Sequence, residues 1–201
     1  ETIAYQIDIA FEQIRLYNLA QKTAQRELLL RKIFETMRSS LDLNVIKNTI
    51  VNEVGKVLNA DICFISSYEA DNDYFFIDEH SEYRSSDDEY SFVGHDSLDL
   101  KLRGFAEIFK NNKEIGYSSI EDFVKEYNLQ GSIEETFLHE INNKSGYGFS
   151  ISYANKILGF MSILYNKESK QLDNEDLDFL RIIATQAGIA IYQANLYNMT
   201  Q

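Results

Sequence analysis

Proline and tryptophan are absent from this chain of 201 residues, and cysteine occurs once, at Cys63. Without proline, no ring removes a backbone N–H from a helix, which suits long uninterrupted helices. A single cysteine excludes a disulfide within the chain and a zinc cluster built on cysteines. A chain that does not depend on disulfides is typical of a reducing compartment, so we expect a cytoplasmic protein.

Long apolar runs and basic character are also missing. No run reaches the roughly 18 apolar residues of a transmembrane helix, so we expect no membrane insertion. The first residues hold neither a basic region nor an apolar block, so no signal peptide is expected. Acids outnumber bases by 32 to 19, giving a net charge of −13. That charge disfavours nucleic acid and anionic membrane surfaces as partners.

What the chain does hold is ordinary for a globular protein, with 44% hydrophobic and 25% charged residues. Hydrophobic periodicity predicts helices and short strands in alternation. The expected helices are 3–38, 43–58, 103–112, 120–129, 132–143 and a last one from a cap at Asp173 to about 199. The expected strands are 61–69 and 74–78, which form a hairpin, 114–118, and the pair 147–153 and 157–165.

The two ends of the chain are related in sequence. Aligned without gaps, residues 1–21 and 181–201 are identical at 10 of 21 positions. We interpret the amino end as the last helix of a preceding copy of a unit of about 180 residues. The alternative is that both ends are amphipathic helices of similar composition. The identities are Ile3/Ile183, Ala4/Ala184, Gln6/Gln186, Ile9/Ile189, Ala10/Ala190, Gln13/Gln193, Leu16/Leu196, Tyr17/Tyr197, Asn18/Asn198 and Gln21/Gln201.

The last helix is apolar on two faces. One face, here named the seam, has the 3-4 spacing of a coiled coil. A helix with two apolar faces must bury both, so the seam predicts a homodimer through the terminal helices. The alternative is that one monomer buries both faces. The seam residues are Leu177, Leu180, Ala184, Ala187, Ile191 and Ala194, and the second face holds Ile182, Ile189, Tyr192 and Leu196.

Two regions together resemble a GAF domain. The first is Asn44–Ile65. The second consists of three nearby segments, Lys156–Lys167, Leu172–Leu180 and Ala184–Ile191. The similarity is to GAF domains found in tandem in bacterial sensor histidine kinases and in phytochrome-like and cyanobacteriochrome proteins. It implies an α+β fold, with an antiparallel sheet covered by long terminal helices on one face and by a pocket with short helices on the other. The division it implies is a helical linker or preceding helix at 1–25, the GAF domain at 26–180 and a signalling helix at 181–201.

The resemblance also bears on the cofactor. Bilin-binding relatives attach their chromophore through a cysteine that often precedes a histidine, and here the similar place reads Phe137-Leu138-His139-Glu140. Leu138 stands where the cysteine would be, so covalent bilin is not expected at that position. His139 stays a candidate ligand contact, and noncovalent tetrapyrrole binding stays open. Cys63 lies on a predicted central strand and does not replace the missing cysteine.

Other family activities fit less well. The Asn166-Lys167 pair resembles part of a cyclic-nucleotide pattern, and we expect Lys167 to pair with an acid at the start of the last helix. No basic or glycine-rich phosphate cradle accompanies it. Methionine sulfoxide reduction needs two cysteines. No catalytic triad signature or metal pair is present, so no catalytic and no metal-ligating residues are expected.

The acidic stretch 69–99 holds eleven acids and one base. A cation site would need acids at fixed positions around a glycine, a pattern that breaks down after Asp73. A solvated loop over the pocket is the favoured interpretation.

The period of the strands predicts which residues line a ligand pocket. Phe64, Ser66 and Tyr68 share one face of the first strand, and Phe160, Ser162 and Leu164 share one face of the last strand. If these faces turn away from the terminal helices they line a ligand pocket, and otherwise they are core. We therefore expect a sensory, regulatory domain of a signalling protein, a histidine kinase on grounds of the resemblance. It would bind an unidentified small molecule and relay its state through dimerising end helices. The alternatives are a dimerising spacer without a ligand and a noncovalent chromophore sensor.

Overall fold

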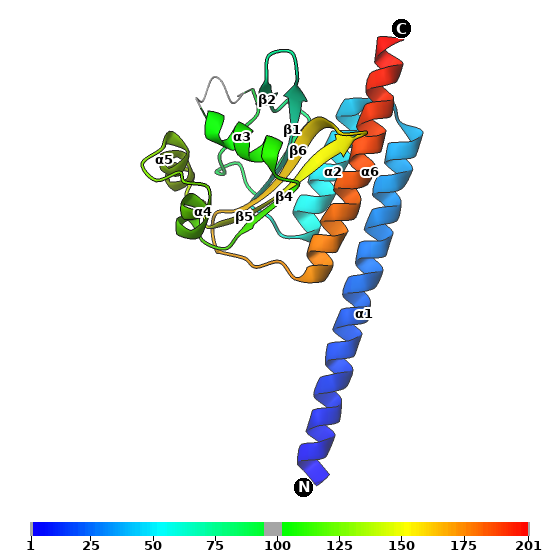
Figure 1. Ribbon diagram of the computed structural model, residues 1–201. Helices are drawn as coiled ribbons and strands as arrows, with labels where there is room; N and C mark the ends of the chain where they lie inside the picture. Colours follow the sequence, from blue (N-terminus) through cyan, green and yellow to red (C-terminus); the bar gives the residue numbers. More distant parts are fainter. Residues whose placement is uncertain (1, 95–101, 201) are drawn as a thin grey trace.

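The computed structural model describes residues 2–94 and 102–200. The predicted helices and strands are present, most ends within about three residues, and one short strand was not foreseen (Figure 1). The helices are α1 (Thr2–Ser39), α2 (Leu43–Val57), α3 (Arg103–Asn111), α4 (Ile120–Glu126), α5 (Ile133–Glu140) and α6 (Asn174–Met199). The strands are β1 (Ile62–Glu69), β2 (Tyr74–Phe76), β3 (Glu82–Arg84), β4 (Glu114–Tyr117), β5 (Ser145–Tyr153) and β6 (Lys156–Tyr165).

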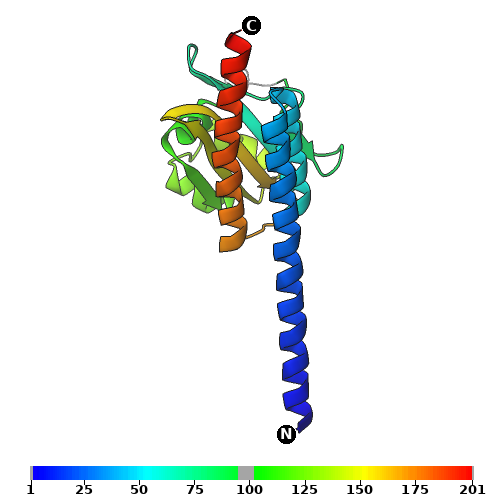
Figure 2. The same ribbon diagram turned by 90° about the vertical axis from the view of Figure 1, so that its right-hand side faces the viewer.

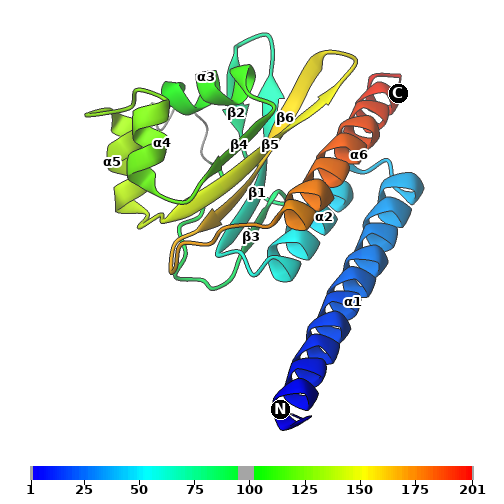
Figure 3. The ribbon, with the colours of Figure 1, turned by 60° about the horizontal axis from the view of Figure 1, so that its bottom comes forward.

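The strands form one antiparallel sheet in the order β2-β1-β6-β5-β4, with β3 also paired to β1. Both predicted hairpins, β1–β2 and β5–β6, are confirmed. Strand β3 is the missed element, because three residues inside an acidic stretch give no readable alternation. The helices divide between the two faces of the sheet, with α1, α2 and α6 on one side and α3, α4 and α5 on the other (Figures 1 and 3). The expected α+β class is therefore confirmed.

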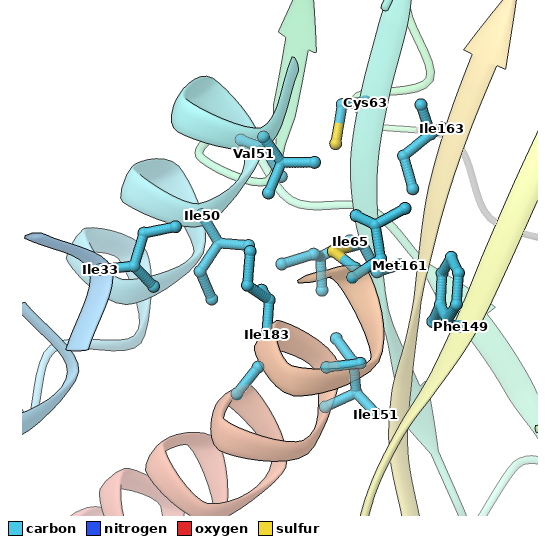
Figure 4. Packing of buried hydrophobic residues seen from close by; sticks show 14 of the residues in the cluster. Ile33, Ile50, Val51, Cys63, Ile65, Phe149, Ile151, Met161, Ile163 and Ile183 are labelled. Atoms are coloured by element: carbon cyan, nitrogen blue, oxygen red, sulfur yellow. The ribbon is translucent and has the colours of Figure 1, made fainter. Parts of the chain in front are cut away.

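Alternate residues of the central strands build the core between the sheet and the long helices (Figure 4). Ile65 and Met161 from the strands meet Ile50 of α2 and Ile183 of α6 there, and each is at most 1% exposed. Burying an aliphatic side chain of this size stabilises the fold by about 1.5–3 kcal/mol. Cys63 lies in the same cluster, with its thiol turned toward the helices.

Helix α1 divides into a free half and a packed half. Its described side chains from residue 3 to 25 are exposed, and Arg26 is the first that is buried. Figure 2 shows the amino-terminal half extending past the rest of the molecule. The packed half is joined to the start of α6, where Lys22 Nζ lies 2.7 Å from Asp173 Oδ2 and Arg26 pairs with Glu175 and Asp176. The boundary predicted between 25 and 26 stays a prediction.

The seam requires a correction. Leu180, Ala184, Ala187, Ile191 and Ala194 are buried in the core of this chain, and Leu177 packs against that core. The seam of α6 thus covers its own sheet, because its small alanines let the helix approach β5 closely. The second face is the outer one, with Ile182 and Leu196 exposed. A contact between copies through α6 would use this outer face.

Within the two described ranges, no helix combines the length and the hydropathy that crossing a membrane requires.

Candidate functional site

An apolar cavity of about 110 Å³, partly open to solvent, lies between the sheet and the short helices. Strands β1, β4, β5 and β6 contribute its floor, and α3, α4 and α5 its cover. Side chains from two clusters meet around it, one centred on Phe160 and Phe123 and the other on Phe64 and Phe137. The cavity is therefore separate from the core under the long helices, on the opposite face of the sheet.

The floor carries most of the residues that strand periodicity proposed. Phe64, Ser66, Phe160, Ser162 and Leu164 all line the cavity. Their registers bring them together, since Phe64 pairs with Ser162 and Ser66 with Phe160 across β1 and β6. The structure thus decides the question that the sequence left open, because these faces turn away from the terminal helices.

Gly148 on β5 completes the floor beside Ser162. A Cβ on Gly148 would lie 2.2 Å from the Phe160 ring, so any larger residue would displace that ring. The absence of a side chain at this position makes room for the Phe160 ring against β5.

Aromatic rings form much of the wall. Phe109 of α3 stacks on Phe160 with ring centroids 4.2 Å apart. Phe92 lies 4.6 Å from Phe64, and 6.0 Å from Phe137 in an edge-on arrangement. Tilted and edge-on pairs of this kind each add about 0.5–1.5 kcal/mol beyond burial. The wall is thus densely aromatic and almost wholly apolar.

The polar groups of the wall are already bonded, with one exception. The Ser66 hydroxyl donates to the Phe160 carbonyl at 3.2 Å, and Tyr117 donates to Asn143 Oδ1 at 2.8 Å. Burial raises the pKa of the Tyr117 phenol. The Tyr147 side chain packs in the core under the long helices, where its hydroxyl accepts a hydrogen bond from Leu172 N at 3.0 Å. The Ser162 hydroxyl has no hydrogen-bond partner among residues 2–94 and 102–200.

Two proposed site residues lie outside the cavity. Tyr68 is near the end of β1, and its hydroxyl donates to Asp73 Oδ1 at 2.6 Å at the surface. His139 is exposed and lines a separate polar groove with Ser119 and Lys144, because its helix turns Leu138 and not His139 toward the sheet. Leu138 occupies the cavity wall and has no sulfur for a thioether bond. Cys63 faces the opposite layer, and burial raises the pKa of its thiol.

Sequence reasoning missed the aromatic cover. Phe92, Phe105, Phe109 and Phe137 all line the cavity but were not named as site residues. Phe105, Ala106 and Phe109 follow the i, i+1, i+4 spacing of one helical face, and this was the available signal. Phe92 follows the acidic region, where neither helical nor strand period applies.

The cover is tied to its surroundings by polar contacts at both ends of α3. The Gly104 N–H donates to the buried Glu134 of α5 at 2.6 Å. At the other end, Lys110 Nζ lies 2.9 Å from Asp73 Oδ2 in the β1–β2 turn. Movement of α3 therefore involves both α5 and the β1–β2 hairpin.

Several acids of the stretch 69–99, such as Asp78, Glu82 and Glu89, serve as structural acceptors. Glu82 accepts the Phe92 N–H at 2.6 Å, which holds that ring over the cavity. Part of this stretch, 95–99, lies outside the described residues. Within the described ranges, no group of three or more His, Cys, Asp or Glu side chains is arranged to hold a metal ion.

The prediction that Lys167 pairs with an acid at the start of the last helix was wrong. Lys167 Nζ lies 3.1 Å from Asp61 Oδ1 and 3.2 Å from Glu89 Oε1, not beside the acids of α6. The reason is that the chain after β6 runs next to the start of β1. Burial by itself would raise the pKa of Asp61, but the backbone N–H groups of Lys167 and Asn166 and the Lys167 ammonium lower it. The cluster fastens the chain beyond β6 to the residue before β1.

Comparison with known proteins now identifies the fold. A family model described as GAF domain matches residues 40–191. The chain belongs to the GAF domain family. GAF domains are generally regulatory sensor modules. No curated protein matches this chain.

Solved GAF structures resemble it closely in fold. The phycoerythrobilin-bound GAF domain of a cyanobacterial phytochrome has a TM-score of 0.70 at 19% identity, covering 86% of this chain and 97% of that one. The GAF domain of Acinetobacter phosphoenolpyruvate-protein phosphotransferase has a TM-score of 0.63 at 17% identity, covering 86% and 96%. The chromophore-binding domain of a bacteriophytochrome from R. palustris has a TM-score of 0.68 at 14% identity, covering 88% and 63%. At these identities the likeness shows the fold alone.

Proposed function

We propose that this GAF domain is the sensory part of a multidomain cytoplasmic signalling protein, with a histidine kinase as its effector. A small molecule in the cavity is the signal, and the long helices carry its state onward. The observation that carries the proposal is the division of the sheet, with an apolar cavity on one face and the long helices on the other (Figure 3).

The route from cavity to helices is short. Neighbouring residues of β6 face opposite sides, so Phe160 and Ser162 line the cavity while Met161 and Ile163 pack under the helices. A second connection starts at Ile77 in the cavity wall. A displacement of the floor by a ligand would therefore reach α2 and α6 through directly packed groups. Such a shift requires that the ligand bind the two arrangements with different affinities.

The second connection is polar. Asp78, next to Ile77, accepts a hydrogen bond from Lys47 of α2 at 2.6 Å, and Lys47 also donates to Ser67 at 2.6 Å. Burial alone would raise the pKa of Asp78, but the Lys47 ammonium and the Ser81 hydroxyl lower it. The ion pair thus fixes one helix of the long-helix layer to a segment of the cavity wall.

The proposed dimer forms through α1 instead of the seam. Ile3, Ile7, Ala10, Ile14 and Tyr17 are exposed and follow the 3-4 spacing of a coiled coil on the free half of α1, which carries further exposed apolar residues on its other faces. An apolar stripe of this length on a helix without a partner favours association with another chain. We propose a second copy as the occupant, because a stripe on the twofold axis of a dimer meets itself.

A dimerising spacer without a ligand is the second candidate. The Phe109–Phe160 stack favours it, because these rings already fill much of the space above β6. The chromophore sensor has less support, because about 110 Å³ is well below the roughly 300–1,000 Å³ of pockets for drug-sized ligands.

Ligand stripping tests the proposal. The protein as purified from cells is compared with the same protein after unfolding in guanidinium, dialysis and refolding. A bound molecule raises the melting temperature by mass action, so the purified sample should melt higher and an organic extract of it should restore the refolded sample. Identical melting of both samples, with no effect of the extract, would instead favour the spacer.

A further inference from the structure

We infer that the cavity takes a neutral molecule of one aromatic ring with a single hydroxyl or amino group, bound through Ser162. This inference rests on the proposed function, since it names the class of ligand for the same cavity.

The volume of the cavity sets an upper limit on the size of the ligand. The cavity measures about 110 Å³. An apolar cavity of about 150 Å³ lined by aliphatic and aromatic side chains stays dry and binds benzene. One six-membered ring is therefore the largest group that enters with small movements of the wall. A nucleotide or a tetrapyrrole would require α3 to leave the sheet.

The wall of the cavity excludes a charged ligand. None of the described residues that line the cavity is charged. A carboxylate or a phosphate would lose its hydration without meeting a cation, which costs several kcal/mol per ion. The buried cation Lys47, whose partner Asp78 follows Ile77 in the chain, is already held by Asp78 and Ser67. The ligand is therefore uncharged.

The polar groups of the wall determine which polar group of the ligand is bound. Ser162 offers the one free hydroxyl among the described lining residues, at the floor and beside Gly148. Ser66 lines the same floor, but its hydroxyl is engaged by the Phe160 carbonyl. A ligand with one donor or acceptor can bond to Ser162 while its ring packs against Phe64 and Phe137. Each further polar group on the ligand would be buried without a partner, which lowers affinity.

Phenol is the first probe, with toluene as the probe that lacks the hydroxyl and benzoate as the probe that carries charge. Calorimetric titrations of the stripped, refolded chain should give binding of phenol and toluene and none of benzoate. Ser162→Ala should weaken phenol binding about threefold to tenfold, the worth of one hydrogen bond, and leave toluene unchanged. Ser66→Ala is the matched control and should leave phenol binding within about twofold, because its hydroxyl is not free.

A filling variant tests the place of binding. Ala106 lies in the α3 wall, and Ala106→Leu should abolish binding of both neutral probes. If that variant fails to fold, the Ser162→Ala and Ser66→Ala pair still decides the matter. Binding of benzoate or biliverdin in place of phenol would overturn the ligand class and leave the sensory proposal standing. Absence of phenol and toluene binding from a chain that also melts alike before and after stripping would contradict both.

Discussion

Gly188 of α6 lies directly against the backbone of Ser152 in β5. A Cβ built on Gly188 would stand 2.4 Å from the Ser152 carbonyl oxygen, well inside van der Waals contact. This contact explains how α6 comes close enough to the sheet to bury the seam alanines. The helix that we propose as an output element is thus seated on a strand whose neighbour, β6, forms part of the cavity floor.

Gly188→Ala should destabilise the domain. In a free helix the change would add about 0.5–1 kcal/mol of stability, but here the new methyl group must push α6 away from β5. Overpacking of this kind costs about 1–3 kcal/mol, so the net effect in urea unfolding should be a loss. Gln193→Ala, at an exposed position of the same helix, is the control and should change stability by less than about 0.5 kcal/mol. A gain in stability from Gly188→Ala would refute the close contact.

Lys47→Met tests the polar connection between α2 and the cavity wall. The Lys47 side chain is 6% exposed, and its loss leaves Asp78 without its cation. Since Asp78 is partly open to water, we expect the free energy of unfolding to fall by about 2 kcal/mol. Breaking a fully buried pair costs about 3–5 kcal/mol. Lys32→Met is the matched control.

Lys32 pairs with Glu53 at the same distance of 2.6 Å but is 61% exposed, so its removal should cost less than about 1 kcal/mol. Both variants are compared by urea unfolding. Equal losses would mean that the Lys47 pair is no more than a surface contact.

Ile14→Glu should separate the proposed dimer without harming the domain. Ile14 is 57% exposed and lies on the free half of α1, so the new charge disrupts only a contact between copies. Ala187→Glu, in contrast, places a charge where the side chain is 0% exposed within one chain, and should unfold the domain. Light scattering gives the mass and circular dichroism the folding of each variant. A dimer that persists in Ile14→Glu would exclude the α1 stripe as the interface.

Acid should weaken the junction between α1 and α6. Burial alone would raise the pKa of Asp173, but Lys22, the Asp176 N–H and Arg26 together lower it from 3.8 to about 2. A carboxyl with a lowered folded-state pKa stabilises the fold above its unfolded pKa, and that stability is lost as the pH falls from about 4 toward 2. Asp173→Asn keeps the helix cap but loses the charge.

The stability difference between Asp173→Asn and the wild type should therefore be constant above about pH 5 and shrink toward zero near pH 2. Melting temperatures across this range, at low salt, measure it. A difference that does not change with pH would show that the charge of Asp173 contributes nothing.

Much of the fold was predictable because its long elements have clear periods. The helical spacing of α1, α2 and α6 and the two hairpins are local properties, and all were foreseen. Strand period also grouped Phe64 with Ser66 and Phe160 with Ser162. It could not say which group faced the helices, because both faces of this sheet are covered and apolar.

The rest depends on contacts between distant residues. The seam of α6 has the spacing of a coiled coil, but the same spacing fits a helix that lies on a sheet, and only the position of β5 distinguishes the two. Lys167 meets Asp61 across more than a hundred residues of sequence. His139 and Leu138 are neighbours in sequence, yet the rotation of α5 sends one to the surface and the other to the cavity.

Native mass spectrometry of the protein as purified from its own cells tests the central claim most directly, because it reads the chain, its copies and any retained molecule together. The account predicts a dimer in which each chain carries one noncovalent, uncharged molecule of low mass. A bare chain, whether dimeric or monomeric, that also fails to take up phenol when it is added would contradict the sensory function proposed for this cavity.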